Sequence, residues 1–546
     1  MLARICSMLL VLMFAQLAHA VQADTENSDI RLGVEKIRNG VRLEFNGESI
    51  SSELVLPALY ERRNYAPVWT NPRSIDQLFD ILGKIDADGL DSDDYHLPAL
   101  QSMRASLSKD ADPDPARAAG YDLLLTDSLI RLGYHLMAGK VDPEALDANW
   151  NMNTAIGDLD TILAMAGAIE NATLPQLVDS LRLEHPTYAR YKRALAHYRE
   201  IGKQGGWPSV PDGPTLKPGM SDERVVAIRR RLVVTGELEN DTSLELFDDQ
   251  LEAAVKRFQK VNGLAADGVV GSGTLAAMNI PVQSRIDQIR VNLERARWVL
   301  HDLPGEYVLA DIAGFRVRYV RNGKEIWSGR SQVGKPYRKT PIFRDSIRYL
   351  EVNPTWTVPP TILKDDILPK VKKDPDYLQR KDMQVLTFSG EPVDPSTIDW
   401  RLYPDSPFAY MIRQQPGPDN ALGRIKFMFP NKHAIYLHDT PSRSLFNHNA
   451  RAFSSGCIRV EHPFEFAEQL LDDNAWDKKR LLGVVESRET TRINLNRPVT
   501  VLLLYWTVDA DDDGGVIFKQ DVYDRDPAIL RELNRPFQFR DGPILD

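Results

Sequence analysis

Apolar residues recur with the period of a helix in the N-terminal part of the chain. In the stretch LLLTDSLIRLGYHLMAGKVDP, four leucines are spaced i, i+4, i+7 and i+11 and therefore share one helix face. These leucines are Leu125, Leu129, Leu132 and Leu136. A glycine and a proline then supply stop signals. The pattern predicts a mainly helical domain over residues 30–205.

A Gly- and Pro-rich stretch, GKQGGWPSVPDGPTLKPGM, predicts a linker at residues 202–220. A compact helical unit is expected over residues 214–281, with Ser221 as the N-cap of its first helix. Two apolar helix faces follow at the expected spacing. They consist of Val225, Ile228 and Leu232 in the first helix and Leu251, Val255 and Phe258 in the second.

From about residue 300 the period changes to two, which predicts strands. Phe315, Val317 and Tyr319 alternate with arginines, and the dipeptide Asn322–Gly323 between two such runs is a strong hairpin signal. Further strands are predicted at residues 345–353, 424–429, 434–437 and 499–508.

These strands indicate a β-rich domain over residues 300–510, followed by a C-terminal extension at 511–546. Residues 360–423 are charged, contain scattered prolines and show few strand signals. We interpret them as an insertion that forms a lid, or capping segment, over a site.

The N-terminus differs from the rest of the chain. MLARICSMLLVLMFAQLAHA has an early basic residue, an apolar run and small residues in an A-x-A pattern, so residues 1–20 are expected to be a secretory signal peptide. Its removal would take Cys6 away and leave Cys457 as the one cysteine of an exported protein. A single free thiol is unusual in an oxidising compartment. Its presence is explained either by burial as an inert side chain or by a catalytic role.

Bulk composition narrows the function classes. The chain has 546 residues, enough for about three or four domains. Its formal net charge of −10 argues against a nucleic-acid-binding protein. Beyond the N-terminus, the sequence contains no apolar run long enough for a membrane span.

Candidate chemistry gathers around Cys457, in IYLHDTPSRSLFNHNARAFSSGCIRVEHP. A nucleophilic cysteine needs a base and donors for an oxyanion. Gly456 permits a tight turn, and the main-chain N–H groups of Gly456 and Cys457 could face a developing oxyanion. His438 is the favoured base because it ends a predicted strand just before a loop. The other nearby histidines are His433, His448 and His462.

The motifs HDTP (438–441) and SGCIR (455–459) resemble the catalytic domain of the YkuD-type L,D-transpeptidases. The wider match looks like the large Gram-negative YcbB type of this family. It includes NPTWTVPPTI at 353–362 and RIKFMFPNKHAIYLHDTP at 424–441. Ser455 stands where many members have a second histidine, which leaves His438 as the base that matches the family pattern.

A second resemblance lies at residues 247–279. The pattern FQ…NGL…DGVVG…T is similar to the three-helix peptidoglycan-binding-like domain. A generic helical spacer is the alternative. Together the resemblances imply a multidomain α+β fold: a helical scaffold domain, a three-helix peptidoglycan-binding-like domain, and a mainly-β YkuD-type catalytic domain with an inserted capping segment.

The resemblance implies a peptidoglycan L,D-transpeptidase of the periplasm that serves cell wall biogenesis and cell shape. Cys457 would attack the carbonyl of meso-diaminopimelate in a stem tetrapeptide and release D-alanine, with His438 shuttling the proton. The side-chain amine of a second diaminopimelate would resolve the thioester into a 3→3 cross-link. Such covalent catalysis requires no metal or cofactor. Carbapenem-type β-lactams are the expected inhibitors.

Further site residues are expected around this pair. Gly456, Ser455 and Tyr436 are candidates for the oxyanion and site loop. Substrate-binding candidates are Arg459, Trp356 and Asp439, with a structural ion pair as the alternative role of Arg459. Ser455 and Asp439 could also orient the catalytic pair, although a main-chain carbonyl is an alternative third member.

Four alternatives remain open at this stage. A zinc site could combine Cys457 with nearby histidines. A papain-like hydrolase is disfavoured because His438 precedes the cysteine along the chain. An L,D-carboxypeptidase would pass through the same acyl-enzyme and use water in place of an amine. A non-catalytic peptidoglycan-binding protein would keep Cys457 as an inert thiol.

Overall fold

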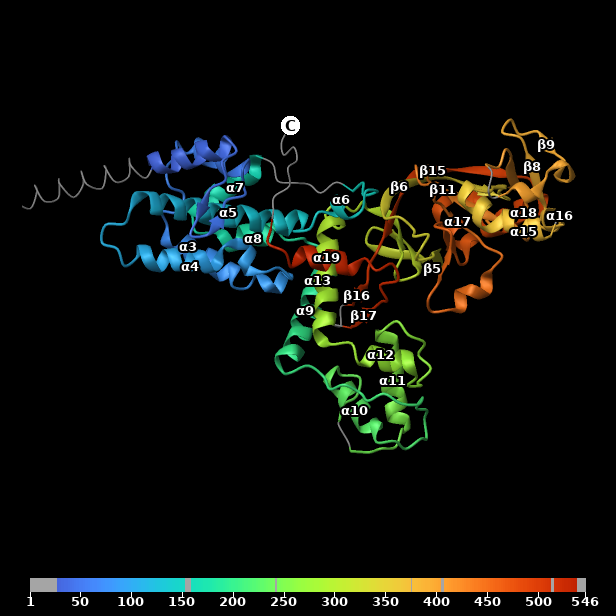
Figure 1. Ribbon diagram of the computed structural model, residues 1–546, viewed down its shortest axis with the longest axis horizontal. Coiled ribbons are helices and arrows are strands. Elements are labelled where there is room, and N and C mark those ends of the chain that lie inside the picture. The colour runs from blue at the N-terminus through green and yellow to red at the C-terminus, as the bar shows by residue number, and fades with distance from the viewer. Residues whose placement is uncertain are drawn as a thin grey trace, which may run out of the picture.

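The chain forms three lobes around a central pair of helices (Figure 1). The computed structural model describes residues 27–152, 159–240, 243–374, 376–403, 407–511 and 515–537. The expected signal peptide, residues 1–20, lies outside the described residues. In the described part of the chain, no helix combines the length and the apolar character needed to cross a membrane.

The N-terminal lobe is helical, as the leucine period predicts. The four leucines of α5 are fully buried or nearly so. A small hairpin, β1 and β2, adds to this lobe. Its elements are β1 (Glu44–Phe45), β2 (Glu48–Ser49), α2 (Val55–Arg62), α3 (Pro72–Leu82), α4 (Leu97–Leu107), α5 (Pro115–Ala138), α6 (Pro143–Leu146), α7 (Leu159–Glu170) and α8 (Leu174–Leu181).

The central helix pair joins the lobes. Helix α9 (Pro186–Lys203) packs against α13 (Val282–Val299), and both share one hydrophobic core with the large sheet of the β-rich lobe. Helix α19 (Asp526–Leu533) packs on α13 from the C-terminal side. These contacts attach the helical lobe to the β-rich lobe (Figure 1).

The second lobe contains α10 (Arg224–Val234), α11 (Asp249–Val261) and α12 (Ser272–Met278) around its own core. Two details differ from the sequence-based expectation. Val210 and Leu216, within the stretch predicted to be a linker, are buried in this core because their apolar side chains find partners there. Ser221 does not cap α10; the Asp222 carboxylate accepts from the N–H of Arg224 instead, at 2.9 Å.

The β-rich lobe is built on a nine-stranded sheet in the order β13-β5-β14-β12-β11-β6-β15-β3-β4. An additional β4–β5 pairing closes the sheet on itself, and the predicted Asn322–Gly323 turn connects these two strands. The strands are β3 (Glu306–Asp311), β4 (Arg316–Arg321), β5 (Lys324–Gly334), β6 (Phe343–Val352), β11 (Ile425–Met428), β12 (Leu437–His438), β13 (Ala452–Ser454), β14 (Ile458–Val460) and β15 (Thr491–Leu504).

Helices α17 (Pro463–Leu471) and α18 (Lys478–Ser487) cover part of this sheet. The hairpin of β16 (Val508–Ala510) and β17 (Val516–Phe518) follows β15 and contacts α9 and α11. The C-terminal segment therefore ties the β-rich lobe to the central helix pair and to the second lobe.

The segment between β7 and β10, residues 356–414, is called the cap below. It holds a second, four-stranded sheet in the order β7-β10-β8-β9 and a separate hydrophobic core. The sequence shows few strand signals here because the strands are very short. The cap comprises β7 (Trp356–Thr357), α14 (Pro360–Ile362), the π-helical turn η3 (Leu363–Ile367), α15 (Leu368–Lys373), α16 (Tyr377–Arg380), β8 (Met383–Leu386), β9 (Pro392–Val393) and β10 (Met411–Gln414).

Candidate active site

Two short parallel strands place the candidate residues on one face of the sheet. β12 and β14 pair with Leu437 opposite Ile458 and His438 opposite Arg459. Leu437 and Ile458 are both 0% exposed and belong to the core. Because side chains alternate along a strand, their neighbours project to the opposite face. Those neighbours are Tyr436, His438, Cys457 and Arg459.

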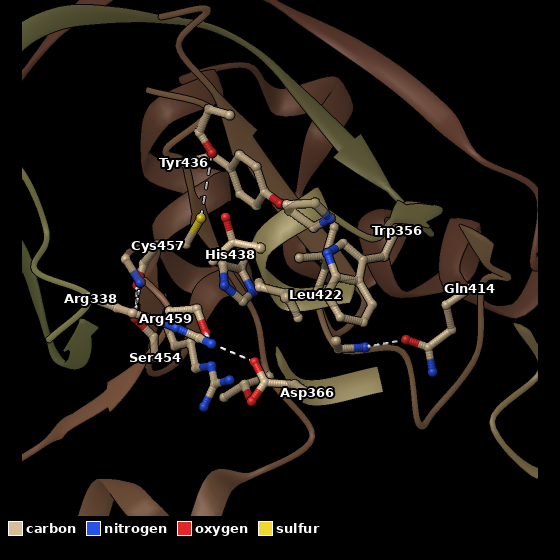
Figure 2. Close-up of a pocket in the computed structure, with 18 of the residues that line it drawn as sticks. Arg338, Trp356, Asp366, Gln414, Leu422, Tyr436, His438, Ser454, Cys457 and Arg459 are labelled. Carbon is tan, nitrogen blue, oxygen red and sulfur yellow. Dashed lines mark hydrogen bonds and ion pairs between the residues drawn. The ribbon is translucent and has the colours of Figure 1, made fainter. Parts of the chain in front are cut away.

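These four side chains line one cavity of 710 Å³ (Figure 2). One wall comes from the sheet and its loops and consists of residues 433–436, 438, 440–442, 454–457 and 459. The facing wall comes from the cap and includes Trp356, Ile362 and Ile367. The cavity therefore lies between the nine-stranded sheet and the cap.

His438 is held by main-chain carbonyls. Its side chain is buried, and Nδ1 donates to the carbonyl oxygen of Asp439 at 2.5 Å. Burial lowers the pKa of His438 to about 3, helped by the charge of Arg459, although hydrogen bonds to the carbonyls of Asp439 and Leu422 act in the opposite direction. The imidazole is therefore neutral at pH 7, and because Nδ1 donates to the Asp439 carbonyl, the lone pair of the neutral ring lies on Nε2.

The Asp439 side chain does not line the cavity. Its carboxylate is buried and accepts from the main-chain N–H of Arg424 at 3.0 Å. The substrate-binding role expected for this carboxylate is therefore not supported by its position. Asp439 contacts the site through its main-chain carbonyl oxygen, which accepts from His438. A main-chain carbonyl was one of the alternatives for the group that orients the histidine.

Cys457 is half-buried beside Tyr436 and has its thiol directed at the carbonyl of Ala434, with Sγ and O 3.7 Å apart. Burial raises the pKa of the Cys457 thiol, while the main-chain N–H and hydroxyl of Tyr436 and the charges of Lys426 and Arg459 lower it. Because the imidazole is neutral as well, the resting pair consists of a thiol and a free base rather than two ions.

The loop that carries Cys457, residues 454–457, is called the cysteine loop below. Gly456 has φ +123°, a conformation that side-chain-bearing residues rarely adopt. Its N–H donates to Ser454 Oγ at 3.1 Å, and that hydroxyl donates to the carbonyl of Cys457 at 2.6 Å. The N–H of Gly456 is thus engaged within the loop, unlike the expectation that it faces an oxyanion.

A second loop, residues 335–342 between β5 and β6, supports the cysteine loop. Thr340 Oγ1 donates to the carbonyl of Gly456 at 2.7 Å and accepts from the N–H of Gly334 at 2.9 Å. Arg338 donates to Ser455 Oγ at 2.9 Å. Ser454 carries no signal in the motif that marks it as a support, although it lies close to Cys457 in the sequence. Thr340 and Arg338 could not be found from the sequence, because nothing in their local pattern links them to a cysteine more than a hundred residues away.

Arg459 lies in the cavity wall without an acidic partner among the described residues. One of its nitrogens, Nη1, donates to Gln332 Oε1 at 3.1 Å, and its buried Nε has no hydrogen-bond partner there. Burial lowers the pKa of Arg459, but a guanidinium keeps its charge in proteins. The arrangement leaves a cation available in the cavity, where a carboxylate would satisfy it.

Of the other candidate residues, some line the cavity and some lie outside it. Trp356 from β7 lines the cavity on the cap side, and His433 lines it on the sheet side with its ring against Phe343. His448 packs on Phe453, and His462 precedes α17 in an exposed position; neither lines the cavity. Within the described residues, no three His, Cys, Asp or Glu side chains are arranged to hold a metal ion.

Comparison with family models identifies three regions of the chain. Residues 305–499 match the L,D-transpeptidase catalytic domain of the YkuD family. Residues 55–195 match a model described as "Scaffold domain", and residues 221–278 match one described as "Putative peptidoglycan binding domain".

Comparison with individual proteins gives one long and one short match. A "Putative L,D-transpeptidase" of Haemophilus influenzae is 27% identical over 528 residues, which cover 95% of this chain and 88% of the relative. The N-acetylmuramoyl-L-alanine amidase CwlM of Mycobacterium tuberculosis is 38% identical over 80 residues, covering 13% of this chain and 20% of the relative.

Among solved structures, the L,D-transpeptidase (residues 123–326) from Xylanimonas cellulosilytica matches with 15% identity over 54% of this chain and 99% of its own. Its TM-score of 0.18 is too low to support a structural argument. The family assignment therefore rests on the matched models and the long relative. The chain carries an L,D-transpeptidase catalytic domain of the YkuD superfamily, together with a scaffold domain and a domain of the peptidoglycan-binding type.

Proposed function

We propose that the protein is a peptidoglycan L,D-transpeptidase that forms 3→3 cross-links through a thioester on Cys457. The observation that carries this proposal is the shared cavity of Cys457 and His438, in which the imidazole is oriented by a main-chain carbonyl. A nucleophile, a base and an orienting group within one cavity are the parts that covalent acyl transfer requires.

In the first half-reaction, Cys457 Sγ attacks the carbonyl of diaminopimelate, the third residue of a stem tetrapeptide. His438 Nε2 takes the thiol proton as the C–S bond forms. The C–N bond to the terminal D-alanine then breaks, and His438 returns the proton to the departing amine. Because both pKa shifts favour the uncharged pair, the proton moves during attack and no stable ion pair precedes it.

The tetrahedral oxyanion needs donors. The Cys457 N–H and the Tyr436 hydroxyl are proposed for this role, since the Gly456 N–H is bonded to Ser454. Burial and the neighbouring cysteine raise the pKa of Tyr436, so the hydroxyl keeps its proton and can donate it to an oxyanion.

In the second half-reaction, the side-chain amine of diaminopimelate from another stem attacks the thioester. His438 accepts the amine proton, the new C–N bond forms, and the C–S bond breaks to regenerate the thiol. Arg459 lines the cavity with no acidic partner among the described residues, and it is proposed to bind a carboxylate of the stem peptide, with Trp356 packing against the peptide chain.

The other domains are proposed to serve the same substrate. Residues 214–281 are proposed to bind the glycan network. Residues 360–423 are proposed to cover the donor peptide. A substrate in the cell wall implies an extracytoplasmic location, and we propose the periplasm with export by residues 1–20. Carbapenem-type β-lactams are proposed to acylate Cys457.

Incubation with a disaccharide-tetrapeptide, followed by mass analysis of the products, tests this function. A cross-linked dimer with loss of D-alanine is the expected product. Trimming to a tripeptide without a dimer would identify an L,D-carboxypeptidase instead, because water would then resolve the thioester. No conversion at all would leave peptidoglycan binding as the function.

A further inference from the structure

Arg338 joins three separate parts of the active site. It lies in the loop between β5 and β6 and forms ion pairs with Asp366 and, at 3.0 Å, with Asp365, both in the π-helical turn η3 of the cap. It also donates to Ser455 Oγ in the cysteine loop, at 2.9 Å. Figure 2 shows Arg338 and Asp366 near Cys457.

We propose that Arg338 is a positioning residue that couples the cap to the cysteine loop. This inference rests on the proposed function, because it concerns the same nucleophile and the same cavity. It assigns a specific side chain to the mechanical link between substrate covering and the placement of Cys457.

The coupling follows from the atoms involved. A single nitrogen, Nη1, serves both Asp366 and Ser455. A guanidinium is planar and rigid, so a shift of the carboxylate turns the whole fork and redirects the other N–H of that nitrogen. Ser455 is separated from Cys457 by Gly456 alone. A displacement of η3 is therefore transmitted to the nucleophile through one side chain.

The cap side of the link also borders the cavity. Ile362 and Ile367, which flank and end η3, lie in the cavity wall together with Asp366. π-Helical turns occur frequently at functional sites. The cap, which is proposed to cover the donor peptide, and the cysteine loop, which carries the proposed nucleophile, are therefore both bonded to Arg338.

Stability of the fold does not require this ion pair. Asp365 and Asp366 have side chains that are 48% and 39% exposed, and pairs of that exposure contribute little to folding. Substitution of Arg338 is therefore expected to leave thermal unfolding near wild type while it alters catalysis. This separation makes the proposal testable.

The experiment is a double-mutant cycle in the full chain. Asp366→Asn and Ser455→Ala are made singly and together, first with Arg338 present and then with Arg338→Gln. kcat and KM for the tetrapeptide are measured for each variant. Arg344→Gln, which removes an arginine–aspartate pair of 3.0 Å with Asp302 at the surface outside the cavity, is the control.

With Arg338 present, the effects of Asp366→Asn and Ser455→Ala on kcat/KM are expected to be non-additive by about threefold or more, although the two side chains share no direct bond. With Arg338→Gln the non-additivity is expected to vanish, and Arg344→Gln is expected to behave like wild type. Arg338→Lys keeps the charge but not the fork, so it should restore KM better than kcat.

Additive effects in both backgrounds, or a wild-type kcat for Arg338→Gln, would overturn the proposal. Failure of the proposed function would look different, since the wild-type protein itself would then form no product. In that case hydrogen exchange of residues 363–373 still decides the coupling: faster exchange in Ser455→Ala supports it, and unchanged exchange refutes it.

Discussion

His438 and Asp439 are neighbours in the sequence and are joined by a side-chain-to-main-chain hydrogen bond. The imidazole Nδ1 donates to the Asp439 carbonyl at 2.5 Å. In the proposed mechanism this main-chain oxygen takes the orienting role that a carboxylate has in Ser-His-Asp triads, so no side-chain substitution at Asp439 removes it directly. Its position, however, depends on what packs against Asp439.

Gly423 packs directly against Asp439. It has φ +65°, and a Cβ built there would lie 2.5 Å from Asp439 Cβ and 2.6 Å from its carbonyl carbon. We expect Gly423→Ala to displace the carbonyl that orients His438 and to lower kcat by up to about 10²-fold, because small misplacements of catalytic groups are costly. Steady-state kinetics with the tetrapeptide measures this effect.

Gly417→Ala is the matched control, since a Cβ at Gly417 meets no atom within 4 Å. It should retain wild-type kcat. A Gly423→Ala protein that unfolds at the wild-type temperature and keeps the wild-type kcat would refute the role of the carbonyl.

Arg459→Gln is expected to raise KM for the donor peptide by roughly tenfold and to change kcat less, because it removes a charged hydrogen-bond donor to the substrate. The difference from wild type should shrink with a donor whose carboxylates are amidated. Arg330→Gln is the control, since Arg330 pairs with Glu461 away from the cavity. An unchanged KM for the free-acid donor would argue that Arg459 is structural.

The pKa shifts predict an unusual pH dependence. An ordinary imidazole loses its base form below about pH 6.5. Because the pKa of His438 is lowered to about 3, the base form persists as the pH falls, so acylation of Cys457 should show no inflection near neutrality. Stopped-flow acylation from about pH 5 upward measures this, and a rate that titrates with an ordinary histidine pKa would contradict the buried, neutral imidazole.

The pKa of the Cys457 thiol is shifted upward, opposite to that of His438, and this shift predicts a second pH dependence. Direct alkylation by iodoacetamide requires the thiolate, and burial raises the pKa of Cys457. The alkylation rate is therefore expected to keep rising beyond about pH 8.5, where an ordinary thiol levels off. A plateau at lower pH would indicate a stable thiolate–imidazolium pair.

Much of the fold could be predicted from period and turn chemistry. The buried leucines of α5 and the Asn322–Gly323 hairpin follow from local patterns that the structure confirms. The sheet of the cap was missed because β7 and β9 are only two residues long and leave no detectable alternation. The prediction of Ser221 as the N-cap was wrong, because the carboxylate of the next residue, Asp222, is a stronger acceptor and takes the N–H of Arg224.

The site likewise contains residues that a sequence motif reveals and residues that only the tertiary structure reveals. Cys457 and His438 could be selected because their chemistry is carried by side chains within a short motif, although their catalytic roles stay predictions. The Asp439 carbonyl has no side-chain signature, and Arg338 meets Ser455 only through the tertiary fold. Residues that support a nucleophile from a distance are therefore invisible to motif reasoning.

The central claim, an acyl-accepting thiol on Cys457 activated by His438, is tested most directly by intact-mass measurement after incubation with a meropenem-type carbapenem. The wild-type chain should gain one drug-sized adduct, Cys457→Ala should gain none, and His438→Ala should gain it much more slowly. An unmodified wild-type chain, or an adduct that survives Cys457→Ala, would contradict the account.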